Sequence, residues 1–80
     1  MDKIDAYKSL NEVFRDIFDD DGISVNEKTT ADDIDGWDSL AHVSLLVSIE
    51  KAFSIKFSMD DVVNFKSVGD IYEAIERGQK

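Results

Sequence analysis

The stretch Gly36-Trp37-Asp38-Ser39-Leu40 stands in front of the most apolar segment of the chain, which runs to Phe53. Gly36 interrupts any helix before it, whereas Asp38 and Ser39 are both favourable helix caps. The pattern therefore predicts a helix over about 39–53 with a serine hydroxyl at its N-terminus. Because free backbone N–H groups and the positive end of the helix dipole meet there, such a position favours a phosphate.

Two apolar stripes run along this predicted helix, since successive residues lie 100° apart around a helix axis. The first stripe, which we expect in the core, consists of Leu45, Leu46, Ile49 and Phe53. The second, on an adjacent side, consists of Leu40, Val43 and Val47. One core face does not need so wide an apolar arc, so we expect the second stripe to face a partner protein.

Before the motif, the sequence predicts one long helix and one long loop. Apolar residues recur at helical spacing over 2–18, and Asp19-Asp20-Asp21-Gly22 should end this helix. The predicted core stripe is Ile4, Tyr7, Leu10, Phe14 and Ile17, with Val13 and Phe18 beside it. Residues 22–37 form the loop, which we expect to be attached to the core by Ile23, Val25, Ile34 and Trp37. Thr30 and Asp33 have the spacing of a capping box that begins a single helical turn.

After the motif, residues 54–57 alternate like a strand, but no second strand is predicted to pair with them, so we expect an extended connector. Ser58 with Asp61, and Ser67 with Asp70, have capping-box spacing and open two further helices. The short third helix should turn Val62, Val63 and Phe65 inward, and the last should end at Gly78 with a stripe of Val68, Ile71 and Ile75. The predicted fold is all-α: a small four-helix bundle of three longer helices and one short one, with a long loop between helices 1 and 2, in a single domain over 1–80.

Composition excludes several classes of function. The 80 residues include no cysteine, which rules out disulfides, thiolate catalysis and cysteine-based zinc sites. The net charge of −9 argues against binding to nucleic acid or to an anionic membrane, and a basic protein partner is one reason for such acidity. No apolar run is long enough to span a bilayer and no signal peptide is recognisable, so we expect a cytoplasmic protein without membrane insertion.

The sequence gives little support to two further interpretations, a serine–histidine hydrolase and a calcium-binding loop. Ser39 and His42 share a helix face, but a hydrolase dyad would need a Gly-x-Ser-x-Gly turn and an oxyanion hole. We instead expect His42 to be half-buried beneath the loop. The acidic turn before Gly22 would be a calcium loop only with an acid at Ile17 and a glutamate at Lys28. A solvated helix end is therefore favoured over a weak divalent-ion site, and we predict no metal.

Taken together, these residues resemble an acyl carrier protein over essentially the whole chain. The resemblance is carried by Asp38-Ser39-Leu40, then Val43, Leu45, Leu46, Ile49, Glu50 and Phe53, then Ile55 and Phe57, a short acidic helix from Asp60, and a last helix with Val68 and Ile71. The spacing of the apolar positions, the size and the acidity make the short Asp-Ser-Leu motif specific.

The resemblance implies that Ser39 receives 4′-phosphopantetheine from coenzyme A, attached by a separate, magnesium-dependent phosphopantetheinyl transferase to which Asp38 presents the serine. The thiol of the arm would carry acyl groups as thioesters, so the chain itself would not be an enzyme. Partner enzymes that load or transfer the acyl group would dock on the second helix, where Leu40, Val43, Val47 and Glu50 match the partner-facing positions. We expect a monomer. An acyl chain could enter between the second and third helices, near Leu45, Leu46, Val62 and Phe65.

Several residues of the predicted second helix differ from the family pattern, and these differences indicate which acyl-transfer pathway the carrier serves. Ala41, Ser44 and Lys51 occupy positions that are acidic in housekeeping fatty-acid carriers. This favours a stand-alone carrier of polyketide, lipid-modification or another specialised acyl-transfer system over general fatty-acid synthesis. Asp38 disfavours a peptidyl carrier, while an aminoacyl or D-alanyl carrier remains an alternative. A second alternative is an unmodified acidic helical module that docks a basic partner.

Overall fold

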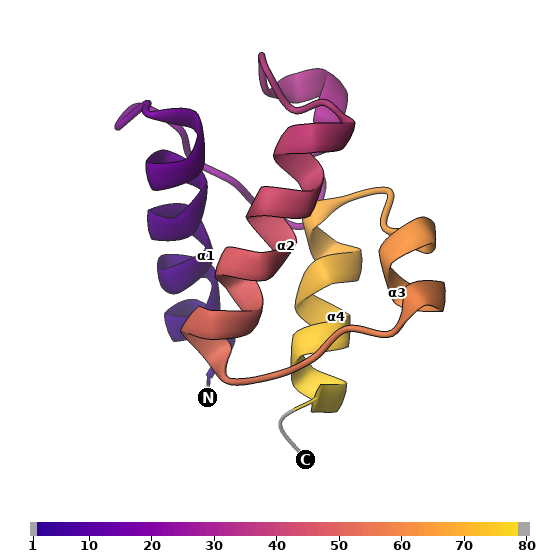
Figure 1. Ribbon diagram of the computed structural model, residues 1–80. Helices are drawn as coiled ribbons and strands as arrows, with labels where there is room; N and C mark the ends of the chain where they lie inside the picture. The colour runs from indigo at the N-terminus through magenta and orange to yellow at the C-terminus, as the bar shows by residue number, and fades with distance from the viewer. Residues whose placement is uncertain (1, 79–80) are drawn as a thin grey trace.

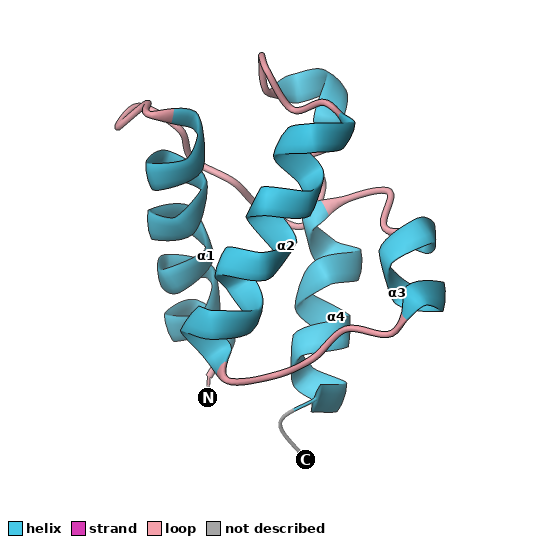
Figure 2. Ribbon diagram, viewed as in Figure 1, coloured by secondary structure: helices cyan, strands magenta, loops and turns pink. Residues whose placement is uncertain are grey.

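The computed structural model describes residues 2–78 and contains four α-helices and one short 3₁₀ turn in that range (Figures 1 and 2). The elements in chain order are α1 (Lys3–Phe18), the 3₁₀ turn η1 (Ala31–Asp33), α2 (Ser39–Phe53), α3 (Met59–Asn64) and α4 (Val68–Gly78). No strand occurs in the described range, and residues 55–58 are an extended connector, as predicted. The all-α fold class is thereby confirmed.

The helices are arranged so that Ser39 lies at one end of the bundle. In Figure 1, α1 rises towards the end at which α2 begins, and α2 descends beside it. The connector then crosses to α3, and α4 returns towards the end at which α1 starts. The 3₁₀ turn and the segment that leads to Ser39 therefore lie near the end of α1, far from the last turn of α4.

One apolar core is formed by all three long helices and the loop. Its buried members are Ala6, Leu10, Phe14, Val25, Ile34, Leu45, Leu46, Ile49, Phe53, Ile55, Val68, Ile71 and Ile75. The predicted core stripe of α2 is completely buried, and so is that of α4. Burial of apolar surface is the main stabilising term for so small a domain, and each long helix contributes one face to it.

Ile4 does not belong to the core, contrary to the prediction. Its side chain is 79% exposed, whereas Ala6, which was not part of the predicted stripe, is 2% exposed. The reason is angular: at about 100° per residue, Ile4 lies about 120° from Leu10 around the helix axis, and Ala6 lies only about 40° away. Tyr7, Leu10, Phe14 and Ile17 do pack in or against the core.

Val63 is also exposed, contrary to the prediction that it faces inward. Its exposed fraction is 72%, while Val62 and Phe65 pack against the core. Phe65 follows the helix as its C-cap. Within α3, Val62 and Val63 are adjacent and lie about 100° apart around the axis, so Val63 points away from the core when Val62 faces it.

Side chains of α1 hold the long loop. Asn11 Oδ1 accepts a hydrogen bond from the Val25 N–H at 2.6 Å, and Arg15 Nε donates to the Ile23 carbonyl at 2.7 Å. Val25 and Ile34 are buried, which confirms that they attach the loop to the core. The Thr30 N–H donates to the Asp33 carboxylate at 2.9 Å, so the predicted capping box also forms.

Of the two capping boxes predicted at the starts of α3 and α4, the first forms completely and the second only in part. Ser58 Oγ accepts from the Asp61 N–H at 3.1 Å, and the Asp61 carboxylate accepts from the Ser58 N–H at 3.5 Å, as predicted. At the start of α4 the Asp70 carboxylate instead accepts from the Lys66 N–H at 2.9 Å, so only half of the predicted box is present. The N–H groups of α4 are satisfied elsewhere, because Val68 donates to the Thr29 carbonyl at 2.8 Å.

The start of α4 approaches the loop backbone so closely that Gly69 is required. Its N–H donates to the Glu27 carbonyl at 3.1 Å, and a Cβ at this position would lie 2.8 Å from that carbonyl oxygen. We expect Gly69→Ala to cost about 1–3 kcal/mol of unfolding free energy, because the loop must move to relieve the overlap. Chemical denaturation measures this, with Gly78→Ala, whose Cβ would meet only an Ile55 side chain at 3.2 Å, as the milder comparison. If Gly69→Ala were as stable as the wild type, the close approach of the start of α4 to the Glu27 carbonyl would not require glycine.

Candidate functional site

Ser39 is the first residue of α2, and its side chain is exposed. Asp38, not Ser39, is the N-cap: its Oδ1 accepts a hydrogen bond from the Ala41 N–H at 2.9 Å. The N–H groups of Ser39 and Leu40 belong to the first turn and have no acceptor within the helix. The serine hydroxyl therefore stands in water beside two backbone donors and the positive end of the helix dipole.

The backbone that leads to Ser39 is held by a glycine and a tryptophan. Gly36 has a φ of 87°, a left-handed conformation that side chains disfavour, and its carbonyl accepts from the Asp38 N–H at 2.9 Å. The Trp37 ring packs edge-on against Phe14, with ring centroids 5.3 Å apart. The turn before the serine is thus anchored to the core of α1, as the sequence predicts for Trp37.

His42 is fixed against the same tryptophan. Trp37 Nε1 donates a hydrogen bond to His42 Nδ1 at 3.0 Å, and the two rings stack with centroids 6.0 Å apart. Phe65 meets the imidazole edge-on at 6.4 Å. His42 is half-buried, which confirms the packing role predicted for it. Its hydrogen bond to Trp37 was not predicted; the only signal in the sequence is a histidine about one turn after a tryptophan.

An open groove with a volume of about 550 Å³ adjoins Ser39, between the first turn of α2 and the C-terminal end of α3. Its lining residues are Ala31, Trp37, Asp38, Ser39, His42, Val43, Val62, Val63, Phe65 and Lys66. Val62 and Phe65 are two of the four residues near which the sequence predicts entry of an acyl chain. The other two, Leu45 and Leu46, are buried in the core and do not line the groove, so the groove does not open onto them in this conformation.

The outer face of α2 is apolar and exposed. Leu40 is 82% exposed, Val43 59% and Val47 44%, so the second stripe lies outside the core, and its contact with a partner stays a prediction. On α3, Val63 lines the same groove as Val43 and is 72% exposed, and Met59, four residues before it, is 77% exposed. Glu50 differs from its neighbours: its Oε2 accepts a hydrogen bond from the Phe57 N–H at 2.8 Å, so the carboxylate holds the connector after α2.

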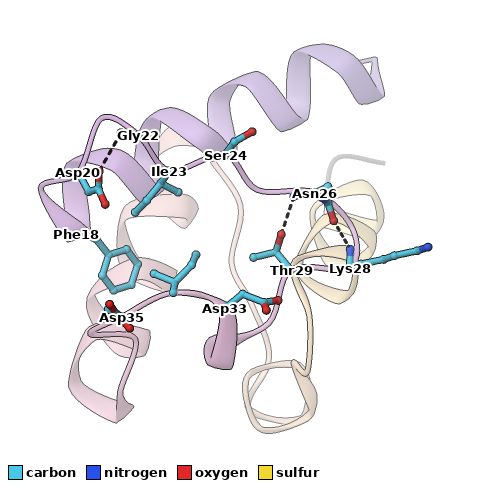
Figure 3. Close-up of a pocket in the computed structure, with 11 residues that line it drawn as sticks. Phe18, Asp20, Gly22, Ile23, Ser24, Asn26, Lys28, Thr29, Asp33 and Asp35 are labelled. Carbon is cyan, nitrogen blue, oxygen red and sulfur yellow. Dashed lines mark hydrogen bonds between the residues drawn. The ribbon is translucent and has the colours of Figure 1, made fainter.

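A second cavity, of about 560 Å³, lies in the loop region and does not include Ser39 (Figure 3). Figure 3 shows that its walls are loop turns closed by their own hydrogen bonds, including Gly22 N–H to Asp20 and Asn26 N–H to Thr29. Although Asp20, Asp33 and Asp35 line it, no group of three or more metal-binding side chains within residues 2–78 is placed to hold an ion. Nor is any helix in that range long and apolar enough to cross a membrane.

A family model described as a phosphopantetheine attachment site matches residues 8–75. The chain belongs to the acyl carrier protein family. Proteins of this family are carriers without catalytic activity of their own, so this chain is a carrier and not an enzyme, and 4′-phosphopantetheine is its covalent cofactor. Acyl carrier proteins interact with phosphopantetheinyl transferases and with enzymes that handle acyl groups.

Two solved structures show the same likeness over nearly the whole chain. A holo acyl carrier protein from Geobacter metallireducens is 39% identical, with a TM-score of 0.86 and coverage of 92% of this chain and 85% of that one. A provisionally assigned acyl carrier protein from Mycobacterium tuberculosis is 26% identical, with a TM-score of 0.80 and coverage of 90% and 96%. A comparison with curated protein sequences gave no match.

Proposed function

We propose that Ser39 is the attachment residue, and that this acyl carrier protein presents acyl groups as thioesters on a phosphopantetheine arm to enzymes of fatty-acid, polyketide or specialised lipid biosynthesis. The observation that carries the proposal is the exposed Ser39 hydroxyl on the first residue of α2. The residues around it fit the group, since the free N–H groups of the first turn favour its phosphate. The adjoining groove offers apolar surface to the rest of the arm and its cargo.

The attachment chemistry belongs to a separate transferase. Ser39 Oγ attacks the phosphate next to the pantetheine arm, the pyrophosphate P–O bond of coenzyme A breaks, and 3′,5′-ADP leaves. The hydroxyl proton is lost, and the arm is joined to Ser39 as a phosphodiester. The thiol at the far end of the arm then forms the thioester. This supplies thiol chemistry to a chain that has no cysteine of its own.

The absence of cysteine also makes the test sharp. The protein is incubated with coenzyme A, magnesium and a transferase of broad specificity, and its intact mass and its thiol content are measured. We expect a gain of one phosphopantetheine and the appearance of one reactive thiol where there was none. An unchanged mass and no thiol, with a carrier of established activity loaded in parallel, would favour the alternative of an unmodified interaction module.

We further propose that partner enzymes dock on α2 through Leu40, Val43 and Val47, with Met59 and Val63 of α3 at the edge of the contact. Large exposed apolar side chains that lie together are typical of interaction sites. The net charge of −9 would steer a basic partner towards this monomeric carrier. Glu50 is less suited to contact a partner, because its Oε2 already accepts a hydrogen bond from the Phe57 N–H.

Substitution of the apolar face should weaken docking without unfolding the protein. We expect the double variant Leu40→Asp, Val47→Asp to lower kcat/KM for loading by the transferase roughly tenfold or more, since one desolvated anchor is worth more than about 1 kcal/mol. Ile4→Asp is the matched control, because Ile4 is as exposed as Leu40 but lies on α1. If both proteins were loaded at the wild-type rate, docking on α2 would be wrong.

Asp38 caps α2, and we expect it also to present Ser39 to the transferase. Two substitutions separate these roles. Asparagine caps a helix about as well as aspartate, whereas alanine loses about 1 kcal/mol, equivalent to a drop in Tm of about 4–8 °C. We expect Asp38→Ala to lower Tm, Asp38→Asn to preserve it, and both to slow loading if the carboxylate presents Ser39 to the transferase. Thermal unfolding and loading rates decide this. Wild-type loading of Asp38→Asn would reduce Asp38 to a helix cap.

A further inference from the structure

The orientation of the His42 side chain in the groove is fixed by two neighbours. Trp37 Nε1 donates to Nδ1 at 3.0 Å, with the two ring planes 24° apart, and Phe65 meets the imidazole edge-on. A ring held in this way keeps its orientation before any ligand arrives, so a ligand need not order it.

The same hydrogen bond selects the tautomer. Trp37 can only donate, so His42 Nδ1 must be the acceptor, and the proton of the neutral ring then lies on Nε2. Within residues 2–78 no hydrogen bond to Nε2 is formed, and the ring lines the groove beside Ser39. The groove therefore contains a donor whose direction is preset and which no other group of the described chain uses.

Ser39 and His42 are three residues apart on α2 and line the same groove. Side chains at this spacing have Cβ atoms about 5–6 Å apart, so a phosphate bonded to Ser39 Oγ lies within reach of the imidazole. The nearby Asp38 carboxylate disfavours an anion, and a hydrogen-bond donor to the phosphate would offset that repulsion.

We propose that the His42 Nε2–H donates a hydrogen bond to the phosphodiester that joins the arm to Ser39, which makes His42 a positioning residue for the arm. The proposal rests on the function proposed above. A hydrogen bond to an anionic oxygen is stronger than one between neutral groups, and together with the free N–H groups at the start of α2 it would direct the arm along the groove. Trp37 acts through His42, because it sets the tautomer.

Lys66 is the competing partner. It is the one permanent cation among the residues that line the groove, so its ammonium group could meet the phosphodiester instead. Lys66 is exposed, however, and its side chain is long and flexible. A test of the proposal must separate these two donors.

The chain allows a direct measurement, because it contains one histidine and, once loaded, one phosphorus. Protein labelled with ¹⁵N-histidine is loaded from coenzyme A, loading is verified by intact mass, and ¹H–¹⁵N and ³¹P spectra of the unloaded and loaded forms are compared. We expect the Nε2 resonance and its proton to shift on loading, with a smaller change at Nδ1. An unchanged Nε2 resonance in fully loaded protein would overturn the proposal and leave the carrier function intact; failure to load would overturn both.

Two variants at the same position give the matched comparison. The amide of asparagine lies near the place of Nδ1, so His42→Asn keeps an acceptor for Trp37 and loses the donor towards Ser39. The amide of glutamine reaches the place of Nε2, so His42→Gln keeps that donor. We expect the ³¹P resonance of loaded His42→Asn to move away from the wild-type position and that of His42→Gln to stay near it. A ³¹P resonance that moves in Lys66→Gln but not in His42→Asn would assign the contact to Lys66 instead.

Discussion

Replacement of Ser39 by alanine is expected to abolish attachment of the phosphopantetheine arm while leaving the fold unchanged. The variant lacks the oxygen that would form the phosphodiester, so loading falls to zero and is not merely slowed. Ser39 is exposed and Asp38 supplies the helix cap, so the change in unfolding free energy should stay within about 0.5 kcal/mol. Intact mass after incubation with coenzyme A and a transferase measures the first effect, and thermal unfolding measures the second.

Ser44→Ala is the matched control for this experiment. Ser44 is an exposed serine on the same helix, five residues further on, and it does not line the groove beside Ser39. The control should gain one arm, as the wild type does. If Ser39→Ala still gained the arm, Ser39 would not be the attachment residue. If Ser44→Ala lost it, the effect would belong to the α2 surface and not to one hydroxyl.

The second large effect is expected from Phe14→Ala, which should unfold much of the protein at physiological temperature. Phe14 is fully buried, and its ring packs against Phe18 and Trp37, so it joins α1 to the turn before Ser39. Loss of a buried phenylalanine side chain costs about 3–5 kcal/mol. A domain of this size has a total stability of roughly 4–12 kcal/mol. Circular dichroism during heating should show a Tm lower by more than about 10 °C.

Ile4→Ala tests whether this cost comes from the core. Ile4 lies on the same helix and in the same predicted stripe, but its side chain is 79% exposed. We therefore expect almost no change in Tm for Ile4→Ala. Comparable losses from the two variants would mean that the first turn of α1 is buried, in conflict with the helix geometry described above.

Local rules predicted most of the fold. The capping boxes at Thr30 and Ser58 each need only two side chains at fixed spacing, and both form. The core stripe of α2 follows from the 100° spacing of apolar residues, and it is buried throughout. The position of Ser39 at a helix N-terminus required no tertiary information, because Gly36 and Asp38 specify it in the chain.

Features that depend on tertiary packing could not be predicted in this way. Ile4 and Val63 are a different case, because the 100° spacing already places them away from Leu10 and Val62, and the predicted stripes included them nonetheless. The hydrogen bond from Phe57 to Glu50 and the contact of Gly69 with Glu27 join parts of the chain that meet only in the folded protein. The same holds for the Trp37–His42 hydrogen bond, which depends on the path of the turn before α2.

The most direct test of Ser39 as the attachment residue is to locate the arm in loaded wild-type protein. The protein is digested and its fragments are sequenced by tandem mass spectrometry, which assigns the added phosphopantetheine to one residue. We predict that the modification lies on Ser39 alone, in the fragment that contains Asp38-Ser39-Leu40. An arm on Ser44, Ser48 or any other hydroxyl would contradict the assignment of the first turn of α2 as the attachment site.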